Sequence, residues 1–250
     1  MHKNPGIRKE EELVQALDGK KVKDINNNLK YVLREMFDHL DDNEIVRSNL
    51  VGGFQKPDLY IEYKLHRIFV SVKSGGAKIV HQELLKSFIG FLRSLGVSTR
   101  SLKTFLYYHF GDGTMDGTGE KRLPYHTLQI KMAKRIKEFN DELNADKDII
   151  KQVVDRCLFL GSHEGNIPAD YIYYGNSEFG CISSRIQVLK HIKRKDWFYM
   201  DNLHIGPLQF RPHARYSGKK IMTEESRWKV DAWWANLNAD IEYISERYNG

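Results

Sequence analysis

Three residues with chemically active side chains, Asp58, Ser71 and Lys73, lie at the ends of two strand-like runs. The runs 59–63 and 67–72 are rich in β-branched and aromatic residues, which favours strands. A carboxylate binds hard divalent cations, and an ammonium can orient an attacking water and offset charge that develops on a phosphate. These residue types predict phosphodiester hydrolysis. The alternative is a cross-strand ion pair beside solvent, worth less than ~1 kcal/mol.

The two runs are separated by a short connection, so we expect them to form a β-hairpin. A two-residue turn at 65–66 would place Asp58 opposite Lys73. Because strand residues two apart share a face, Ser71 would lie on the same face as Lys73. The hairpin therefore predicts a cluster of Asp58, Ser71 and Lys73 at its open end, and a register shift of one residue would destroy the cluster.

The sequence around this hairpin predicts further helices and strands. Apolar residues recur at helical spacing over 29–40 and over 79–95, and a final helix is expected over 230–247. A short charged helix is expected over 9–17, and a strand over 103–110. This mixture of elements predicts an α/β fold with a central mixed sheet flanked by helices.

The composition is that of a soluble globular protein, with 250 residues, of which 41% are hydrophobic and 29% charged. The formal net charge of +6 is compatible with a polyanionic partner. Cys157 and Cys181 lack CxxC spacing, which argues against a disulfide framework or a structural zinc site. The segment 1–13 lacks the apolar core of a signal peptide, and no apolar run approaches the ~20 residues of a membrane span. We expect a cytoplasmic protein without a membrane partner.

The hairpin segment resembles the core motif of the PD-(D/E)xK nuclease superfamily. Pro57-Asp58 stands before the first strand, and Ser71-Val72-Lys73 ends the second. The resemblance implies a restriction-endonuclease-like core, with Asp58 and the Val72 carbonyl as ligands of Mg²⁺ and Lys73 as the residue that positions the attacking water.

The same resemblance implies a function. It suggests a Mg²⁺-dependent endonuclease acting on double-stranded DNA, with a type II restriction enzyme as the first hypothesis. We expect one nuclease domain over 1–250, with a catalytic core over about 24–123 and DNA-contacting and packing elements over about 124–250.

Ser71 departs from the family pattern, which usually has Asp or Glu two residues before the lysine. A hydroxyl is a weaker metal ligand than a carboxylate, and some type II enzymes of this fold use a glutamate from the following helix instead. Glu83, in the helix expected over 79–95, is the candidate. Glu35 resembles the first-helix glutamate that these enzymes often place near the metal. A solvated surface position is the alternative for both glutamates.

A basic segment late in the chain is the candidate DNA-binding element. It follows a strand expected over 203–210, and it contains no acidic residue. Arginine can bind phosphate or read guanine, and lysine adds salt-dependent phosphate affinity. Gln82 could bind a phosphate or the water of a metal ion. The candidate DNA-binding residues are Gln82, Arg211, His213, Arg215, Lys219 and Lys220.

Two further hypotheses remain open beside the restriction enzyme. One is a repair, recombination or phage nuclease that reads DNA structure. The other is a DNA-binding protein that has lost metal chemistry through Ser71. A palindromic site would imply a homodimer, or a monomer that nicks each strand in turn. A restriction role would imply a cognate DNA methyltransferase that acts on the same site.

Overall fold

The computed structural model describes residues 5–53, 55–76, 78–119, 121–163, 165–194, 197, 202–212 and 224–249. These residues form two compact units. Unit 1 takes its residues from 1–77, 158–191 and 236–250, and unit 2 takes its residues from 78–157 and 192–235. Within the described ranges, no helix combines the length and apolar character that crossing a membrane requires. A single nuclease domain over 1–250 stays a prediction.

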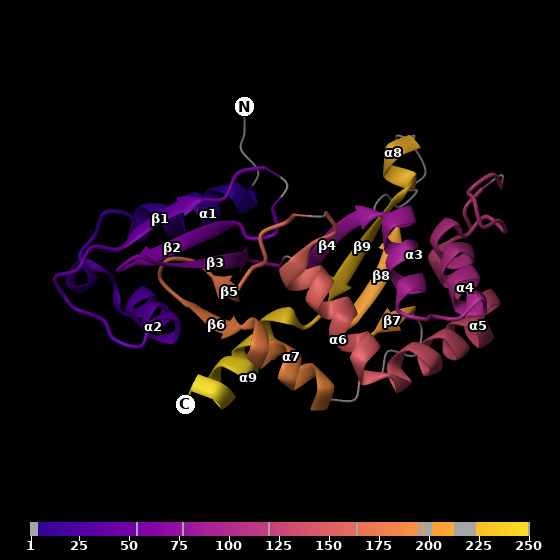
Figure 1. Cartoon of the computed structure of the whole chain (residues 1–250). Helices are drawn as coiled ribbons and strands as arrows, with labels where there is room; N and C mark the ends of the chain where they lie inside the picture. The colour runs from indigo at the N-terminus through magenta and orange to yellow at the C-terminus, as the bar shows by residue number, and fades with distance from the viewer. Residues whose placement is uncertain are drawn as a thin grey trace. The chain divides into compact units, whose positions relative to one another are not determined.

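Unit 1 is built on a mixed five-stranded sheet with the strand order β1-β2-β3-β5-β6. Neighbouring strands are antiparallel except β3 and β5, which are parallel. The mixed sheet with its helices confirms the expected α/β class. The strands are β1 (Arg47–Leu50), β2 (Leu59–Tyr63), β3 (His66–Lys73), β5 (Tyr171–Gly175) and β6 (Gly180–Ser184). The helices are α1 (Pro5–Leu17), the 3-10 turn η1 (Val22–Asp24), α2 (Asn27–Met36), α7 (Arg185–Arg194) and α9 (Leu237–Asn249) (Figure 1).

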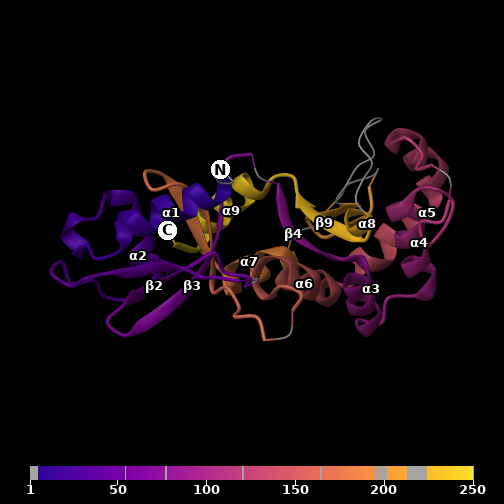
Figure 2. The same cartoon turned by 90° about the horizontal axis from the view of Figure 1, so that it is seen from above.

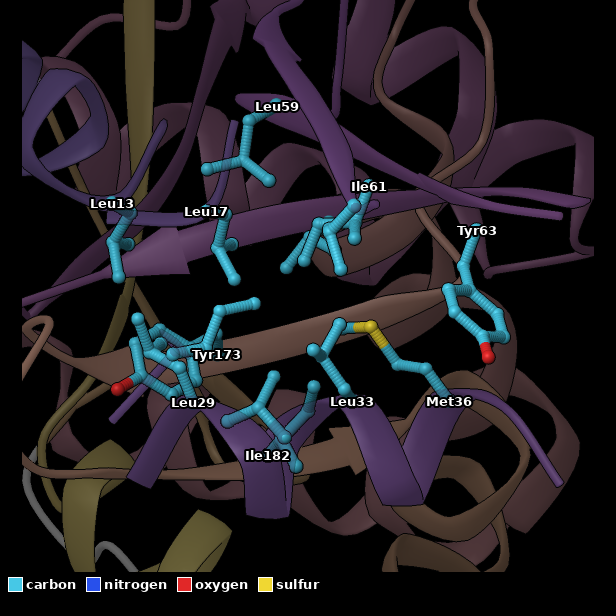
Figure 3. Packing of buried hydrophobic residues seen from close by; sticks show 14 of the residues in the cluster. Leu13, Leu17, Leu29, Leu33, Met36, Leu59, Ile61, Tyr63, Tyr173 and Ile182 are labelled. Atoms are coloured by element: carbon cyan, nitrogen blue, oxygen red, sulfur yellow. The ribbon is translucent and has the colours of Figure 1, made fainter. Parts of the chain in front are cut away.

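The core of unit 1 lies between one face of this sheet and the helices α1 and α2. Figure 3 shows Leu13 and Leu17 of α1 in the same cluster as Leu59 and Ile61 of β2. Leu33 of α2 is fully buried in this cluster. Because alternate residues of a strand face one side, β2 contributes Leu59, Ile61 and Tyr63 to the core and leaves Tyr60 and Glu62 for the opposite face.

One polar contact caps helix α2, and another joins helix α9 to this sheet. Asn26 caps α2, because its side chain accepts a 2.9 Å hydrogen bond from the Leu29 amide. On the opposite face of the sheet from α2, the hydroxyl of Ser183 donates to the carbonyl of Ile241 in α9. The helix expected over 29–40 is confirmed over 29–36, because α2 ends at Met36.

The register of the β2–β3 hairpin differs from the expectation by two residues. Leu59 pairs with Val70, and Tyr63 pairs with His66 across a turn at 64–65. This register places Asp58 opposite Ser71 instead of Lys73. Because a shift of two residues keeps every side chain on its face, the expected cluster survives the error.

The turn itself explains why the sequence misplaced the register. Lys64 and Leu65 both have positive φ, at 46° and 68°, as a two-residue hairpin turn of type I′ requires. Such turns usually carry Asn or Gly at these positions. Neither residue occurs here, so the residue types gave no signal for the position of the turn.

Unit 2 contains an antiparallel four-stranded sheet with the order β4-β9-β8-β7. Figure 2 shows α3 and α6 on one side of β4 and β9. The rings of Phe88, Phe105 and Phe210 pack together in its core. The strands are β4 (Ile79–Leu84), β7 (His204–Ile205), β8 (Leu208–Pro212) and β9 (Lys229–Trp234). The helices are α3 (Leu85–Ser94), α4 (Thr99–Phe110), α5 (Tyr125–Ala145), α6 (Lys147–Asp155), which leads into the π-helix η2 (Arg156–Leu160), and α8 (Glu224–Arg227).

Three elements expected wholly or partly within unit 2 are wrong in whole or in part. The helix expected over 79–95 is strand β4 followed by helix α3, and the strand expected over 103–110 lies in helix α4. The helix expected over 230–247 is strand β9 followed by helix α9. β4 and β9 pair with each other across about 150 residues of sequence, and local periodicity carries no information on such pairing.

Candidate active site

Asp58 is held at the open end of the β2–β3 hairpin by the backbone of β3. The Asp58 amide donates a 2.9 Å hydrogen bond to the Val70 carbonyl, which continues the strand ladder beyond β2. Its Oδ2 atom accepts a 2.6 Å hydrogen bond from the Val72 amide and a 3.2 Å hydrogen bond from the Ser71 hydroxyl. The carboxylate orientation is therefore set by a rigid strand.

Lys73 ends β3, and its ammonium lies beside this carboxylate. The Nζ atom donates to Asp58 Oδ2 at 3.3 Å, to Ser71 Oγ at 3.0 Å and to the Val72 carbonyl at 2.8 Å. The Lys73 side chain is 16% exposed, so the charge is largely withdrawn from bulk water. The structure brings Asp58, Ser71 and Lys73 together on one face, as the sequence predicted.

Glu10 of α1 is a second carboxylate at this site, and sequence reasoning missed it. Burial, followed by the charge of Asp58, raises the pKa of Glu10 to about 7, although Lys73 acts in the opposite direction. Glu10 lies three residues before Leu13 and seven before Leu17, so it extends their core-facing stripe. A glutamate at an apolar position of the expected helix over 9–17 was the signal.

The donor set of the site fits a hard divalent cation. Asp58 and Glu10 supply carboxylate oxygens, and the Val72 carbonyl oxygen lies at the same end of the sheet. Mg²⁺ is commonly bound through one or two carboxylates, with waters and substrate phosphates filling the other positions. In the part of the chain that the structure describes, no group of three or more His, Cys, Asp or Glu side chains could hold a metal. The fit therefore rests on two carboxylates and an open coordination shell.

Ser71 occupies the position that carries Asp or Glu in the usual family pattern. It is 1% exposed, it donates to Asp58, and it accepts from Lys73. A buried hydroxyl that bridges a carboxylate and an ammonium orients both groups. Ser71 thus links the two charged residues, and Glu10 supplies the second carboxylate.

Glu83 lies on strand β4 of unit 2, and not on a helix as expected. Both of its carboxylate oxygens accept hydrogen bonds from Arg156, at 3.0 and 2.7 Å, and His81 lies 3.2 Å from one of them. Burial would raise the pKa of Glu83, but the bonds from His81 and Arg156 outweigh burial and lower it to about 2. Its role as a metal ligand stays a prediction, and this pairing weighs against it.

The two remaining candidates, Glu35 and Gln82, also form hydrogen bonds, Glu35 through its backbone and Gln82 through its side chain. Glu35 lies in the last turn of α2, where its backbone carbonyl accepts a 3.0 Å hydrogen bond from the Tyr171 hydroxyl. Burial raises the pKa of its carboxyl. The Gln82 amide, in unit 2, donates to Asp231 of β9 at 3.1 Å. The metal and DNA-binding roles of Glu35 and Gln82 stay predictions.

Arg211 is the one late basic candidate that lies within the described residues. It is on β8, in the same cross-strand row as Asp231 and Gln82. Its guanidinium lies 3.4 Å from the centre of the Trp233 ring and donates to Gln209 at 3.0 Å. The single strand expected over 203–210 is instead an antiparallel pair of short strands, β7 and β8. The candidates His213, Arg215, Lys219 and Lys220 lie outside the described residues.

Comparisons with known proteins give a likeness to solved structures. No protein-family model matches the chain, and no curated protein matches it. Among solved structures, it is similar to restriction endonuclease MspI in complex with its cognate DNA, with a TM-score of 0.46 and 16% sequence identity. The similarity covers 88% of this chain and 85% of that chain. At this identity and TM-score, the function has to be argued from the residues of the chain itself.

Proposed function

We propose that this chain is a Mg²⁺-dependent endonuclease of the type II restriction class, which hydrolyses phosphodiester bonds in double-stranded DNA. The observation that supports this proposal is the pair of Lys73 and Asp58 at one end of the unit 1 sheet, with half-buried Glu10 near enough for both charges to act on its pKa. A structural ion pair needs only Asp58 and Lys73. A second, half-buried carboxylate beside Asp58 costs stability, and a divalent cation would remove that cost.

Asp58, Glu10 and the Val72 carbonyl would hold the cation. When bound, Mg²⁺ supplies Lewis-acid polarisation of the scissile phosphate. The Val72 amide keeps Asp58 in a fixed orientation through the 2.6 Å hydrogen bond. This preorganisation is what a catalytic carboxylate needs, because no reorientation is then required during the reaction.

Lys73 supplies the positive charge of the site. Its ammonium is positioned by Asp58, Ser71 and the Val72 carbonyl, so it can hold the attacking water and offset the negative charge that develops on the phosphate. Ser71 keeps Lys73 and Asp58 in contact and needs no metal bond for that role. The resemblance of the Pro57-Asp58 and Ser71-Val72-Lys73 segments to the nuclease motif supports DNA as the substrate.

Digestion of supercoiled plasmid with Mg²⁺ tests the proposal. We expect discrete bands with the wild type, and a loss of rate on the order of 100- to 1000-fold in Asp58→Asn and in Lys73→Met. Glu62→Gln and Arg67→Met are matched controls, because these residues form an ion pair on the same hairpin at 2.7 Å. The control variants should cut like the wild type.

The other outcomes separate the rival hypotheses. DNA binding without cleavage in either Mg²⁺ or Mn²⁺ would contradict a nuclease and support the noncatalytic binding protein. Cutting of branched DNA without a fixed sequence would replace the restriction class with a structure-selective nuclease. Sedimentation with a mapped palindromic site would distinguish a homodimer from a monomer, and protection of that site by methylation would support a cognate methyltransferase.

A further inference from the structure

The turn between β5 and β6 lies at the same end of the unit 1 sheet as the candidate active site. Lys73 pairs with Tyr174 in the parallel β3–β5 ladder, and Tyr174 pairs with Cys181 across the β5–β6 hairpin. Strands are spaced by about 4.8 Å, so β6, the second strand of this hairpin, lies roughly 10 Å from Lys73. That distance corresponds to about three base-pair rises of duplex DNA, at 3.4 Å each.

This turn presents Phe179 to solvent. Its side chain is 69% exposed, although burial of an aromatic ring is strongly favourable. The turn around it is not loose: the Asn176 side chain accepts hydrogen bonds from the amides of Glu178 and Phe179, at 2.8 and 3.1 Å. Asn26, the residue that caps α2, donates to the Ser177 carbonyl at 2.8 Å. Phe179 is therefore held away from the core by an ordered turn.

The base of the turn is equally fixed. The Tyr173 hydroxyl donates to the Asn176 carbonyl at 2.5 Å, and the Asn176 amide donates to the Phe179 carbonyl at 2.9 Å. Gly175 has a φ of 154°, and a side chain there would collide with the Phe179 carbonyl. Because the turn closes this tightly, the backbone at Phe179 is held in place and keeps the ring on the exposed side of the turn.

A groove of about 630 Å³ runs beside the Phe179 ring. Ser74 and Gly75, which directly follow Lys73, line it together with Tyr174. It carries one cation, Lys9, and one carboxylate, Glu242, so its charges balance. A track for phosphates would be basic, whereas a neutral groove with an exposed aromatic ring suits the flat face of a base.

Resting on the proposed function, we propose that Phe179 stacks on a nucleobase of the DNA strand whose phosphate lies at Lys73, and that the groove takes this base. Aromatic residues next to a cutting site can separate neighbouring bases, and stacking on the ring replaces the base contact that is lost. The ordered turn removes the entropy cost of ordering the backbone around the ring when DNA binds. Phe179 is then a substrate-positioning residue, distinct from the residues that act on the phosphate.

Binding of a duplex that contains the mapped cleavage site tests this inference. The affinity is measured in EDTA, where DNA is not cut, with 2-aminopurine placed about three nucleotides from the scissile bond, the spacing that matches the position of the hairpin. We expect the wild type to increase the fluorescence, because 2-aminopurine brightens when it leaves the base stack. Phe179→Ala should weaken binding about tenfold or more and lose the increase. Phe179→Tyr should retain both, and Phe179→Leu, which is apolar but not planar, should lose both.

The control is Ile186→Ala, since Ile186 is 78% exposed in α7 of the same unit. It should bind and cut like the wild type. Suppose the wild type cleaves plasmid and the Phe179 variants bind and cut like it. This result would overturn the inference on Phe179 and leave the proposed nuclease function in place. Variants that change the oligomeric state in sedimentation, with unchanged fluorescence, would assign Phe179 to a contact between copies and also overturn it. A wild type that does not cut DNA overturns both proposals.

Discussion

Glu10 and Asp58 are two carboxyl groups from distant parts of the chain that lie near enough for the Asp58 charge to raise the pKa of Glu10. Burial and then the charge of Asp58 raise the pKa of Glu10 to about 7, although Lys73 acts in the opposite direction. Two carboxylates this close repel each other when both are ionised. Their proximity is the feature that separates this cluster from a simple ion pair between Asp58 and Lys73.

The variant Glu10→Gln should stabilise the metal-free protein at pH 8 and weaken its response to Mg²⁺. The amide keeps the size of the side chain and removes the charge that repels Asp58. We expect a higher Tm than the wild type in EDTA, and a smaller rise in Tm on titration with Mg²⁺. Differential scanning fluorimetry measures both effects.

The matched control for Glu10 is Glu12→Gln. Glu12 lies on the same helix, with its side chain 47% exposed and paired with Lys9. Its Tm should match the wild type with and without Mg²⁺. A Glu10→Gln protein that is less stable in EDTA and responds fully to Mg²⁺ would remove Glu10 from the site.

Glu83 should stabilise the fold, and its contribution to the free energy of unfolding should depend on pH because its pKa is low. Because bonding to His81 and Arg156 outweighs burial and lowers the pKa to about 2, the ionised form stabilises the fold above the unfolded value of 4.5. This stabilisation is lost as the pH falls from 4.5 toward 2. Glu83→Gln should lower the free energy of unfolding at pH 7 by about 3 kcal/mol, as loss of a buried partner does.

Urea unfolding at pH 7 and at pH 3 measures the Glu83 effect, and the difference between variant and wild type should shrink at the lower pH. Glu138→Gln is the control, because its pair with Arg100 is on the surface. If Glu83 instead binds metal, the variant would unfold like the wild type and need more Mg²⁺ for cleavage.

Ser71→Ala should lower the cleavage rate about tenfold while the affinity for DNA stays unchanged. The hydroxyl bridges Asp58 and Lys73, and a hydrogen bond to a charged group contributes about 1.5–3 kcal/mol. Single-turnover cleavage gives the rate, and binding in EDTA gives the affinity. Ser48→Ala removes a buried hydroxyl of β1 that donates to the Tyr60 carbonyl, so it controls for stability alone. Equal rates in both variants would show that Ser71 has no positioning role.

Arg211→Ala should weaken binding to double-stranded DNA and lower the slope of log K against log salt by about one, if the guanidinium contacts a phosphate. Arg211→Lys should restore the slope, because it keeps the charge. Arg100→Ala is the control, since the Arg100 side chain is 72% exposed. Binding curves at several salt concentrations decide the matter. An unchanged slope in Arg211→Ala would confine Arg211 to its packing on Trp233.

The sequence by itself determined which residues of the hairpin share a face. Alternation along a strand places Ser71 and Lys73 on one side whatever the long-range fold, and Asp58 joins them in any register shifted by an even number of residues. The register error of two therefore left the cluster intact. The helix α2 could also be predicted from local sequence, because its cap at Asn26 and its apolar spacing lie within one short segment.

Only the tertiary structure decided which distant groups complete the site. Leu13 and Leu17 pack α1 against the sheet, and this packing brings Glu10 near Asp58. No local sequence pattern predicts that these two segments lie close together. Glu83 belongs to a strand because β4 pairs with β9, and its charge is matched by Arg156 from another helix. Local sequence sets the face of a side chain, whereas burial of apolar surface between distant segments sets its neighbours.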